Sequence, residues 1–277
     1  RDYYASRGLG DVYKRQIRTP EPFLPAGTVI AREQTYAHTF HKEDAPKQAF
    51  AGSEEDDRQV VFSGPHFKAT FDKQSGLLVS YRYKKQEYIH NGQGPRPFFW
   101  RAPTDNDYGA KLPVRLKAWK EASYQEPKAE SFNVVRDKDT TAVKVTYRFP
   151  QTDARWDITY KVYGNGVIKV DNHFVAENAQ TPMIPRVGLR MQLPARITSL
   201  TYYGRGPEEN YRDRRTSQFI GEYTSGIQDM YEPYVRPQEN NHRTDIYWCT
   251  LTSKAKEGLL FVADRTFEMN VSNYPLE

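Results

Sequence analysis

Cysteine is almost missing from the 277-residue sequence, which contains only Cys249. A single cysteine excludes an intrachain disulfide, so packing and hydrogen bonds must hold the fold together. No spacing of Cys and His residues matches a zinc site, and we predict no metal ligands in this chain. Cys249 lies in the strand-like run 246–251, which favours a buried, small hydrophobic side chain over a nucleophile.

Long apolar runs and blocks of one charge are also missing. No stretch approaches the roughly 20 consecutive apolar residues that span a bilayer, so we expect no membrane partner. The formal net charge is +5, but the 40 Lys and Arg residues are interleaved with 35 Asp and Glu residues. The basic residues therefore form no cluster in the sequence. We therefore expect no nucleic-acid partner. Aromatic residues are plentiful, with 20 Tyr and 14 Phe, which favours folded β structure over disorder.

Three segments precede the main body of the sequence. Residues 1–16 share no periodicity with the rest of the sequence and resemble translated adapter sequence, so we predict a sequencing or assembly artefact. Residues 17–41 combine a Pro-Ala-Gly turn with a mixed apolar and polar run, as the last strands of a small sandwich do. Residues 42–57 are charged and poor in large apolar side chains, which predicts a solvated linker.

Residues 58–277 alternate between apolar and polar side chains, the period of a half-buried strand. The alternation is regular over residues 143–149 and 156–162. It returns over 167–175 after a Gly-Asn-Gly turn, which predicts an antiparallel meander. Weaker examples lie at residues 67–71, 77–83, 187–193 and 267–271. One short helix is predicted at 114–122. Because a lone sheet leaves its apolar face in water, we predict a large two-sheet sandwich.

Three polar and aromatic segments interrupt this strand pattern. Charged residues set among Gly, Pro and aromatic side chains are typical of functional loops. The segments are PRPFFWRAPTDNDYG at residues 95–109, GRGPEENYRDR at 204–214 and DMYEPYVRPQEN at 229–240.

Asp105, Asn106 and Asp107 place oxygen ligands close together, as a calcium loop does. The Gly and the later acid of such a loop are missing at their expected positions. A turn in which these side chains bond their own backbone is therefore favoured.

Glu208 and Glu239 could form the carboxylate pair of a glycosidase, which requires a separation of about 5 or about 9 Å. Neighbouring acids and bases such as Glu209 and residues 212–214 more often form ion pairs that hold a loop. His242, next to an arginine, is for the same reason interpreted as a hydrogen-bonding loop residue rather than a general acid.

Taken together, in this order and spacing, three motifs resemble the C-terminal small-chain domain of β-galactosidases of glycoside hydrolase family 2, over residues 58–277. The motifs are RPFFWRAPTDNDYG at residues 96–109, GRGPEENYRDR at 204–214 and MYEPYVRPQENNHRTD at 230–245. The resemblance implies an all-β, antiparallel supersandwich of the galactose-mutarotase-like type that is incomplete at its C-terminus. Residues 17–41 are similar to the end of the immunoglobulin-like domain that precedes it. In that family a (β/α)₈ barrel upstream carries both catalytic glutamates. The resemblance therefore implies no catalytic residue and no cofactor in this chain, with magnesium and sodium in the missing domains.

The resemblance further implies a fragment, truncated at both ends, of a retaining β-galactosidase that removes terminal β-D-galactose and assembles as a homo-oligomer. In that enzyme the missing catalytic domain would bind the β-galactoside substrate. The segment from Asp105 to Gly109 is similar to one near the active-site mouth, so Asp105, Asn106, Asp107 and Gly109 are expected to face the pocket. The motif residues expected to be structural are Arg101, Glu208, Asn210, Tyr211, Asp213, Arg214, Glu239 and Asn240.

Two other functions remain open at this point. An aldose 1-epimerase shares the implied fold and needs only a carboxylate base and a histidine acid. A carbohydrate-binding module would stack sugars on exposed rings such as Trp100, Trp119 or Trp248. Their apolar or helical surroundings favour buried core positions instead.

Overall fold

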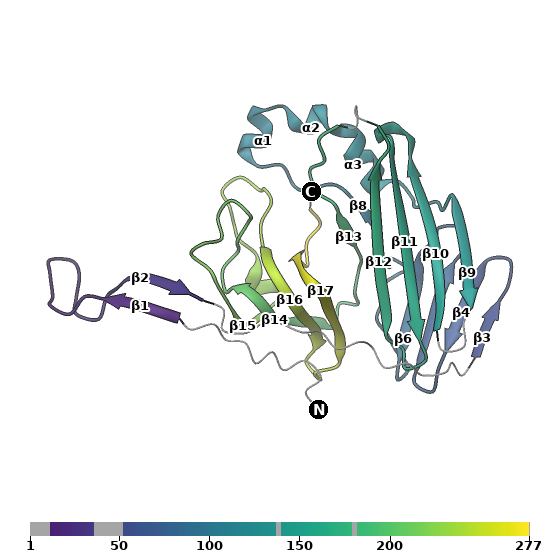
Figure 1. The fold of residues 1–277 in the computed structure, drawn as a ribbon, viewed down its shortest axis with the longest axis horizontal. Coiled ribbons are helices and arrows are strands. Elements are labelled where there is room, and N and C mark those ends of the chain that lie inside the picture. The colour runs from purple at the N-terminus through teal and green to yellow at the C-terminus, as the bar shows by residue number, and fades with distance from the viewer. Residues whose placement is uncertain (1–11, 36–51, 137–139, 179–181, 277) are drawn as a thin grey trace. The chain divides into compact units, whose positions relative to one another are not determined.

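A computed structural model describes residues 12–35, 52–136, 140–178 and 182–276 of the chain (Figure 1). The described residues form antiparallel sheets with a few short helices, which confirms the all-β prediction. They divide into two compact units, each described separately below. Unit 1 contains the described residues within 1–44, 198–232 and 240–273, and unit 2 those within 45–197, 233–239 and 274–277. Among the described helices, none combines the length and apolar character needed to cross a lipid bilayer.

The first sheet of unit 2 is a meander of five strands in chain order. They are β3 (Gly52–Glu55), β4 (Gln59–Ser63), β5 (Phe67–Asp72), β6 (Leu78–Tyr83) and β7 (Gln86–Glu87). Gly76 turns the chain between β5 and β6 with φ of +75°, a conformation that side chains with a Cβ rarely adopt. β3 lies within the predicted linker, whose residues 42–51 fall outside the described ranges.

The second sheet of unit 2 has four antiparallel strands. They are β9 (Ser131–Arg136), β10 (Thr140–Phe149), β11 (Ala154–Tyr163) and β12 (Ile168–Ala176), in the order β12-β11-β10-β9. The predicted alternation is confirmed: the apolar side chains of β10 from Val143 to Phe149 are buried, while Lys144 and Arg148 are exposed. Gly166, with φ of +91°, closes the predicted turn before β12.

The two sheets enclose one hydrophobic core, so the predicted sandwich is confirmed for unit 2 (Figure 1). Phe71 of β5 meets Tyr160 of β11 across it, with ring centroids 5.2 Å apart. Phe99 lies at the aromatic centre, with its ring centroid 4.8 Å from that of Trp119 and 5.3 Å from that of Trp156. Full burial of each such ring contributes about 1.5–3 kcal/mol.

A short sheet and three helices complete unit 2. They are β8 (Arg96–Phe98), β13 (Gly188–Arg190), α1 (Asp105–Gly109), α2 (Leu112–Arg115) and α3 (Lys117–Tyr124), with a 3₁₀ turn, η1 (Pro150–Thr152). β8 pairs with β13, and Figure 1 shows the helices together near one end of the sheets. The helix predicted at 114–122 corresponds mainly to α3. The strand predicted at 187–193 is only three residues long.

Unit 1 contains a four-stranded sheet in the order β15-β14-β16-β17. Its strands are β14 (Ile197–Gly206), β15 (Phe219–Gly226), β16 (His242–Ser253) and β17 (Gly258–Asn270), with the 3₁₀ turn η2 (Gln228–Met230). Cys249 is buried in β16, as predicted, and burial raises the pKa of its thiol to about 12. A thiol in that state is a poor nucleophile at neutral pH.

A separate hairpin pairs β1 (Val12–Gln16) with β2 (Val29–Gln34). β1 falls in the segment interpreted as an artefact, and β2 in the segment interpreted as the end of an immunoglobulin-like domain. Both interpretations, and the domain boundaries as a whole, stay predictions.

Candidate functional site

The segment Asp105–Gly109 is a short helix, where the sequence predicted a turn. Thr104 has the extended backbone of an N-cap, and its hydroxyl accepts a hydrogen bond from the amide of Asp107. The carboxylate of Asp107 accepts one in return from the amide of Thr104, at 2.9 Å. This reciprocal capping satisfies two amides that would otherwise lack partners, which explains the helix.

Arginines hold both carboxylates of this helix. The guanidinium of Arg101 donates to Asp107 Oδ1 at 2.8 Å, and Asp107 is only 8% exposed. On the solvent side, Arg236 donates to Asp105 Oδ1 at 2.9 Å and covers the ring of Tyr108, 4.1 Å from its centroid. Asp107 and Asp105 therefore form ion pairs with different arginines. In the described ranges, no group of three or more His, Cys, Asp or Glu side chains is placed to hold a metal.

Glu239 joins the segment 233–239 to the chain that enters α1. Its side chain is 1% exposed, and one oxygen accepts a hydrogen bond from Arg186. The other accepts from the amide of Ala102 at 3.2 Å. A buried carboxylate requires such partners, because leaving it unpaired costs several kcal/mol. We call the set Arg101, Asp105, Asp107, Arg186, Arg236 and Glu239 the α1 cluster.

The residues predicted to face a pocket differ in their exposure. Asp105, Asn106 and Gly109 are exposed, and a Cβ added at Gly109 would meet nothing within 4 Å. The side chain of Asn106 has no hydrogen-bond partner among the described residues. Asp107 instead points inward, to Arg101 and Thr104. Three of the four are thus accessible to a ligand, whereas Asp107 holds the helix.

The cavity beside the α1 cluster is small. It has a volume of about 130 Å³ and is lined by Trp100, Arg101 and Asp107 together with apolar residues of α2 and of 183–185. Pockets that bury a small ligand usually measure about 300–1,000 Å³. This cavity alone is therefore too small to enclose a sugar.

In unit 1 the segment 204–214 is fixed by Asn210, which is 0% exposed. Its amide nitrogen donates to the carbonyl oxygens of Arg205 and Glu208, each at 3.0 Å. Its amide oxygen accepts from the amide of Thr244 at 3.0 Å and from the Thr244 hydroxyl at 2.6 Å. All the side-chain groups of Asn210 are therefore satisfied inside the unit.

Ion pairs hold the rest of this segment, as predicted from its alternating charges. Glu209 pairs with Arg214, and Arg212 pairs with Glu268 of β17 at 2.6 Å. Arg214 also covers the ring of Tyr211, 4.6 Å from its centroid.

The structure also places three further residues that the sequence predicted to be structural. Asp213 is exposed, the backbone oxygen of Asn240 accepts from Asn270 at 2.7 Å, and Tyr211 stacks on the ring of His242 at 5.2 Å. These contacts are structural in kind, and the roles assigned to the motif residues stay predictions.

His242 is a buried hydrogen-bonding residue, at the first position of β16 rather than in a loop. Its Nδ1 lies 2.8 Å from Asn270 Oδ1, and its Nε2 lies 3.0 Å from Glu268 Oε2. The hydrogen bond with His242, aided by one with Arg212, lowers the pKa of Glu268 from 4.5 to about 2, despite partial burial.

Glu268→Gln is expected to lower the melting temperature near pH 7 and to have a progressively smaller effect as the pH falls. A carboxylate whose pKa is depressed by folding contributes stability above its unfolded pKa, and this contribution is lost as the pH falls through the folded pKa. For Glu268 the window runs from 4.5 down to about 2. Thermal melts from about pH 7 to about pH 2 measure it. Glu222→Gln, at an exposed position of β15, is the matched control. An effect of Glu268→Gln that does not change with pH would contradict the expectation.

The proposed carboxylate pair is not supported by the surroundings of its members. Glu208 is exposed and belongs to unit 1, whereas Glu239 is buried in unit 2 with Arg186. The oxygens of Glu239 already have protein partners, so the carboxylate has no free face for a substrate.

The family of the chain follows from comparison with known proteins. A family model described as the β-galactosidase small chain matches residues 63–277. The chain belongs to the β-galactosidase small-chain family. The predicted resemblance is therefore confirmed, and the match includes all three polar and aromatic segments.

Curated relatives of this small-chain domain carry the name β-galactosidase. One from Priestia megaterium is 34% identical over 221 residues, which cover 80% of this chain and 21% of the relative. One from Lactobacillus delbrueckii subsp. bulgaricus is 34% identical over 259 residues, covering 92% of this chain and 24% of the relative. One from Streptococcus thermophilus is 30% identical over 258 residues, with coverages of 92% and 24%. The chain thus spans about a quarter or less of the length of these relatives.

Several partners of the small-chain motifs were not predicted from the sequence. Arg186, Glu268 and Asn270 each hold a motif residue but lie outside the motifs, whereas Thr244 lies near the end of the third motif without a predicted role. They occur in or near ordinary strands, where a polar residue on the alternating pattern is the usual solvent-facing one. Only the spatial pairing of strands reveals them.

Proposed function

We propose that this chain is a non-catalytic C-terminal part of a retaining β-galactosidase of glycoside hydrolase family 2. In this proposal the chain shapes the pocket that receives a terminal β-D-galactose residue, and α1 supplies part of the rim. The catalytic glutamates, magnesium and sodium belong to domains outside this chain, and the whole enzyme assembles as a homo-oligomer. Membership of the small-chain family and the name shared by the relatives support the enzyme class.

The state of Glu239 carries the non-catalytic part of the proposal. A glycosidase acid or nucleophile must reach the sugar, whereas the Glu239 side chain is 1% exposed and bonded to Arg186 and to the Ala102 amide. The cavity beside α1 is also too small to be a complete sugar pocket, which supports a role of this chain as one wall of a larger pocket. The exposed Asn106 and Gly109 then form the part of α1 that is available to a ligand held mainly by another domain.

The two alternatives receive less support from the described residues. An epimerase would use a pair such as His242 and Glu268, but a carboxylate with a pKa of about 2 is a weak general base at neutral pH. A binding module would need exposed rings, whereas Trp100 and Trp119 are buried in the core of unit 2. Trp248 is half-buried and stacks on Tyr203, with centroids 6.5 Å apart.

The proposal is tested by assaying a chromogenic β-galactoside with this chain alone and with the longer enzyme that carries it. We expect no turnover by the chain and clear turnover by the enzyme. In the longer enzyme, Asn106→Ala should raise KM severalfold without changing the melting temperature, because the Asn106 side chain has no partner among the described residues.

Asn273→Ala, the same change at an exposed position of unit 1, is the control. Turnover by the chain alone that disappears in Glu208→Gln or Glu239→Gln would overturn the non-catalytic role. An unchanged KM in Asn106→Ala would overturn the placement of α1 at the rim.

A further inference from the structure

Two arginines lie directly opposite each other in the short sheet of unit 2. Arg96 of β8 and Arg190 of β13 are register partners in the antiparallel pair. Side chains opposite each other in such a pair project from the same face, so like charges there repel and destabilise the pair. A protein that keeps two cations in this position needs something to offset the repulsion.

The protein offsets it only in part. Arg96 donates through Nη2 to the carbonyl oxygens of Ser123, at 3.1 Å, and of Gln125. These are carbonyls at the end of α3, where the helix dipole favours a cation. Arg96 has no other hydrogen-bond acceptor and no ion pair among the described residues, so its Nε and Nη1 groups are available.

Arg190 has even fewer polar partners. Its guanidinium lies over the rings of Phe98 and Tyr124, 5.2 and 5.8 Å from their centroids. In the part of the chain that the structure describes, it bonds to no acceptor and pairs with no carboxylate. The rings hold the guanidinium in place and leave its donor edge free.

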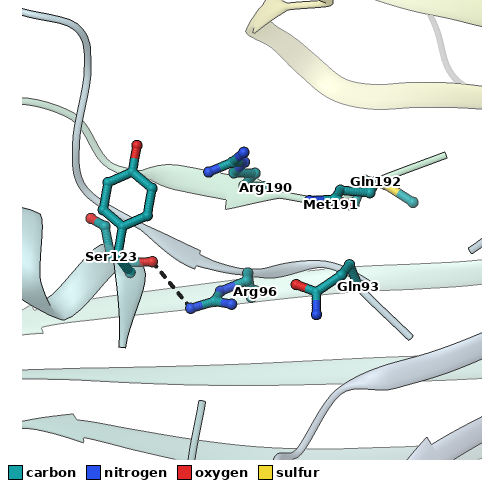
Figure 2. Close-up of a pocket in the computed structure, with 7 residues that line it drawn as sticks. Gln93, Arg96, Ser123, Arg190, Met191 and Gln192 are labelled. Atoms are coloured by element: carbon teal, nitrogen blue, oxygen red, sulfur yellow. Dashed lines mark hydrogen bonds between the residues drawn. The ribbon is translucent and has the colours of Figure 1, made fainter. Parts of the chain in front are cut away.

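A cavity of about 230 Å³ lies against these two side chains. Gln93 and Gln192, which carry amide donors, line it together with Ser123 and Tyr124. Figure 2 shows the Arg96 and Arg190 side chains on facing strands, with Gln93 and Gln192 in the adjoining chain just outside these strands. Burial lowers the pKa of Arg96, Glu126 raises it, and Arg190 lowers it further. The cavity thus faces two cations and several neutral donors.

We propose that this cavity binds a small oxyanion, a carboxylate or a phosphate, between the guanidinium groups of Arg96 and Arg190. Planar guanidinium groups present paired N–H donors that match the oxygens of such anions, and charge-assisted hydrogen bonds are the strong ones. The volume admits a phosphate or a small organic acid. The site is separate from the α1 cluster, and its existence does not depend on glycosidase activity.

The test measures binding of inorganic phosphate and of acetate to this chain by calorimetry, with sodium chloride at matched ionic strength as the reference. We expect saturable binding of at least one of the two anions at a single site. Arg190→Gln should weaken it by about tenfold or more, because it removes one charged donor group. The anion that binds more tightly distinguishes a phosphate ligand from a carboxylate ligand.

Arg190→Lys keeps the charge but loses the planar fork, so it should retain intermediate affinity. Arg58→Gln, at an exposed position of the same unit, should bind as the unmodified protein does. Circular dichroism of each variant verifies that the sheets are intact. Absence of saturable binding for both anions, or equal affinity in Arg190→Gln, would overturn the proposal. Both results are independent of whether any galactoside is hydrolysed.

Discussion

Arg186→Ala is expected to destabilise unit 2 by about 3–5 kcal/mol, the usual cost of removing one partner from a buried ion pair. The substitution would remove the guanidinium that pairs with the Glu239 carboxylate, whose side chain is only 1% exposed. The cost arises because a buried charge without its counter-ion has lost its hydration and gained too little in return. Urea unfolding followed by tryptophan fluorescence measures it.

Arg58→Ala is the matched control, because it removes the same side chain from an exposed position of unit 2. It should change the free energy of unfolding by no more than about 0.5 kcal/mol. The double variant Arg186→Ala with Glu239→Leu should recover part of the loss, since both charges are then gone. A loss for Arg186→Ala no larger than that of the control would show that the pair contributes nothing.

Asn210→Ala is expected to destabilise unit 1 by about 3 kcal/mol or more, because each buried polar group left without a partner costs about 1–3 kcal/mol. The substitution orphans the carbonyl oxygens of Arg205 and Glu208 and both donors of Thr244. The melting temperature should fall by several degrees.

Asn210→Asp separates hydrogen bonding from volume, because it keeps the shape of the side chain but turns the donor into an acceptor that faces two carbonyl oxygens. It should be at least as harmful as Asn210→Ala. Asn273→Ala, an exposed asparagine of the same unit, should leave the melting temperature within about a degree. If Asn210→Asp melted like the unmodified protein, the hydrogen bonds assigned to Asn210 would be wrong.

The strands of unit 2 were predictable because the alternation of apolar and polar side chains along each strand indicates which side chains are buried. Over β10 and β11, every second side chain is apolar and every second one is buried. The helix α1 was not predictable in this way, because its five residues contain no apolar period and depend on the cap formed by Thr104 and Asp107. Such a cap uses residues that favour turns equally well.

The candidate site was predictable to a different extent. The motif segments were found because polar residues break the strand pattern, but their partners were not. Arg186 and Ala102 meet Glu239 across 53 and 137 positions of the sequence. Contacts between residues so far apart in the sequence depend on the tertiary fold, and no local pattern indicates them. For the same reason, the sequence did not predict the burial of Asp107 or the pairing of Arg96 opposite Arg190.

The link between Glu239 and Ala102 also has a consequence for the order in which the molecule assembles. Both sheets of the sandwich are complete once residue 176 is available, yet the carboxylate that fastens the entrance to α1 comes from residue 239. Closing so long a loop is entropically costly and comes after local pairing. During synthesis the two sheets can therefore pair before Glu239 is available to bond the entrance of α1. Until then Arg186 lacks the one carboxylate with which it pairs among the described residues.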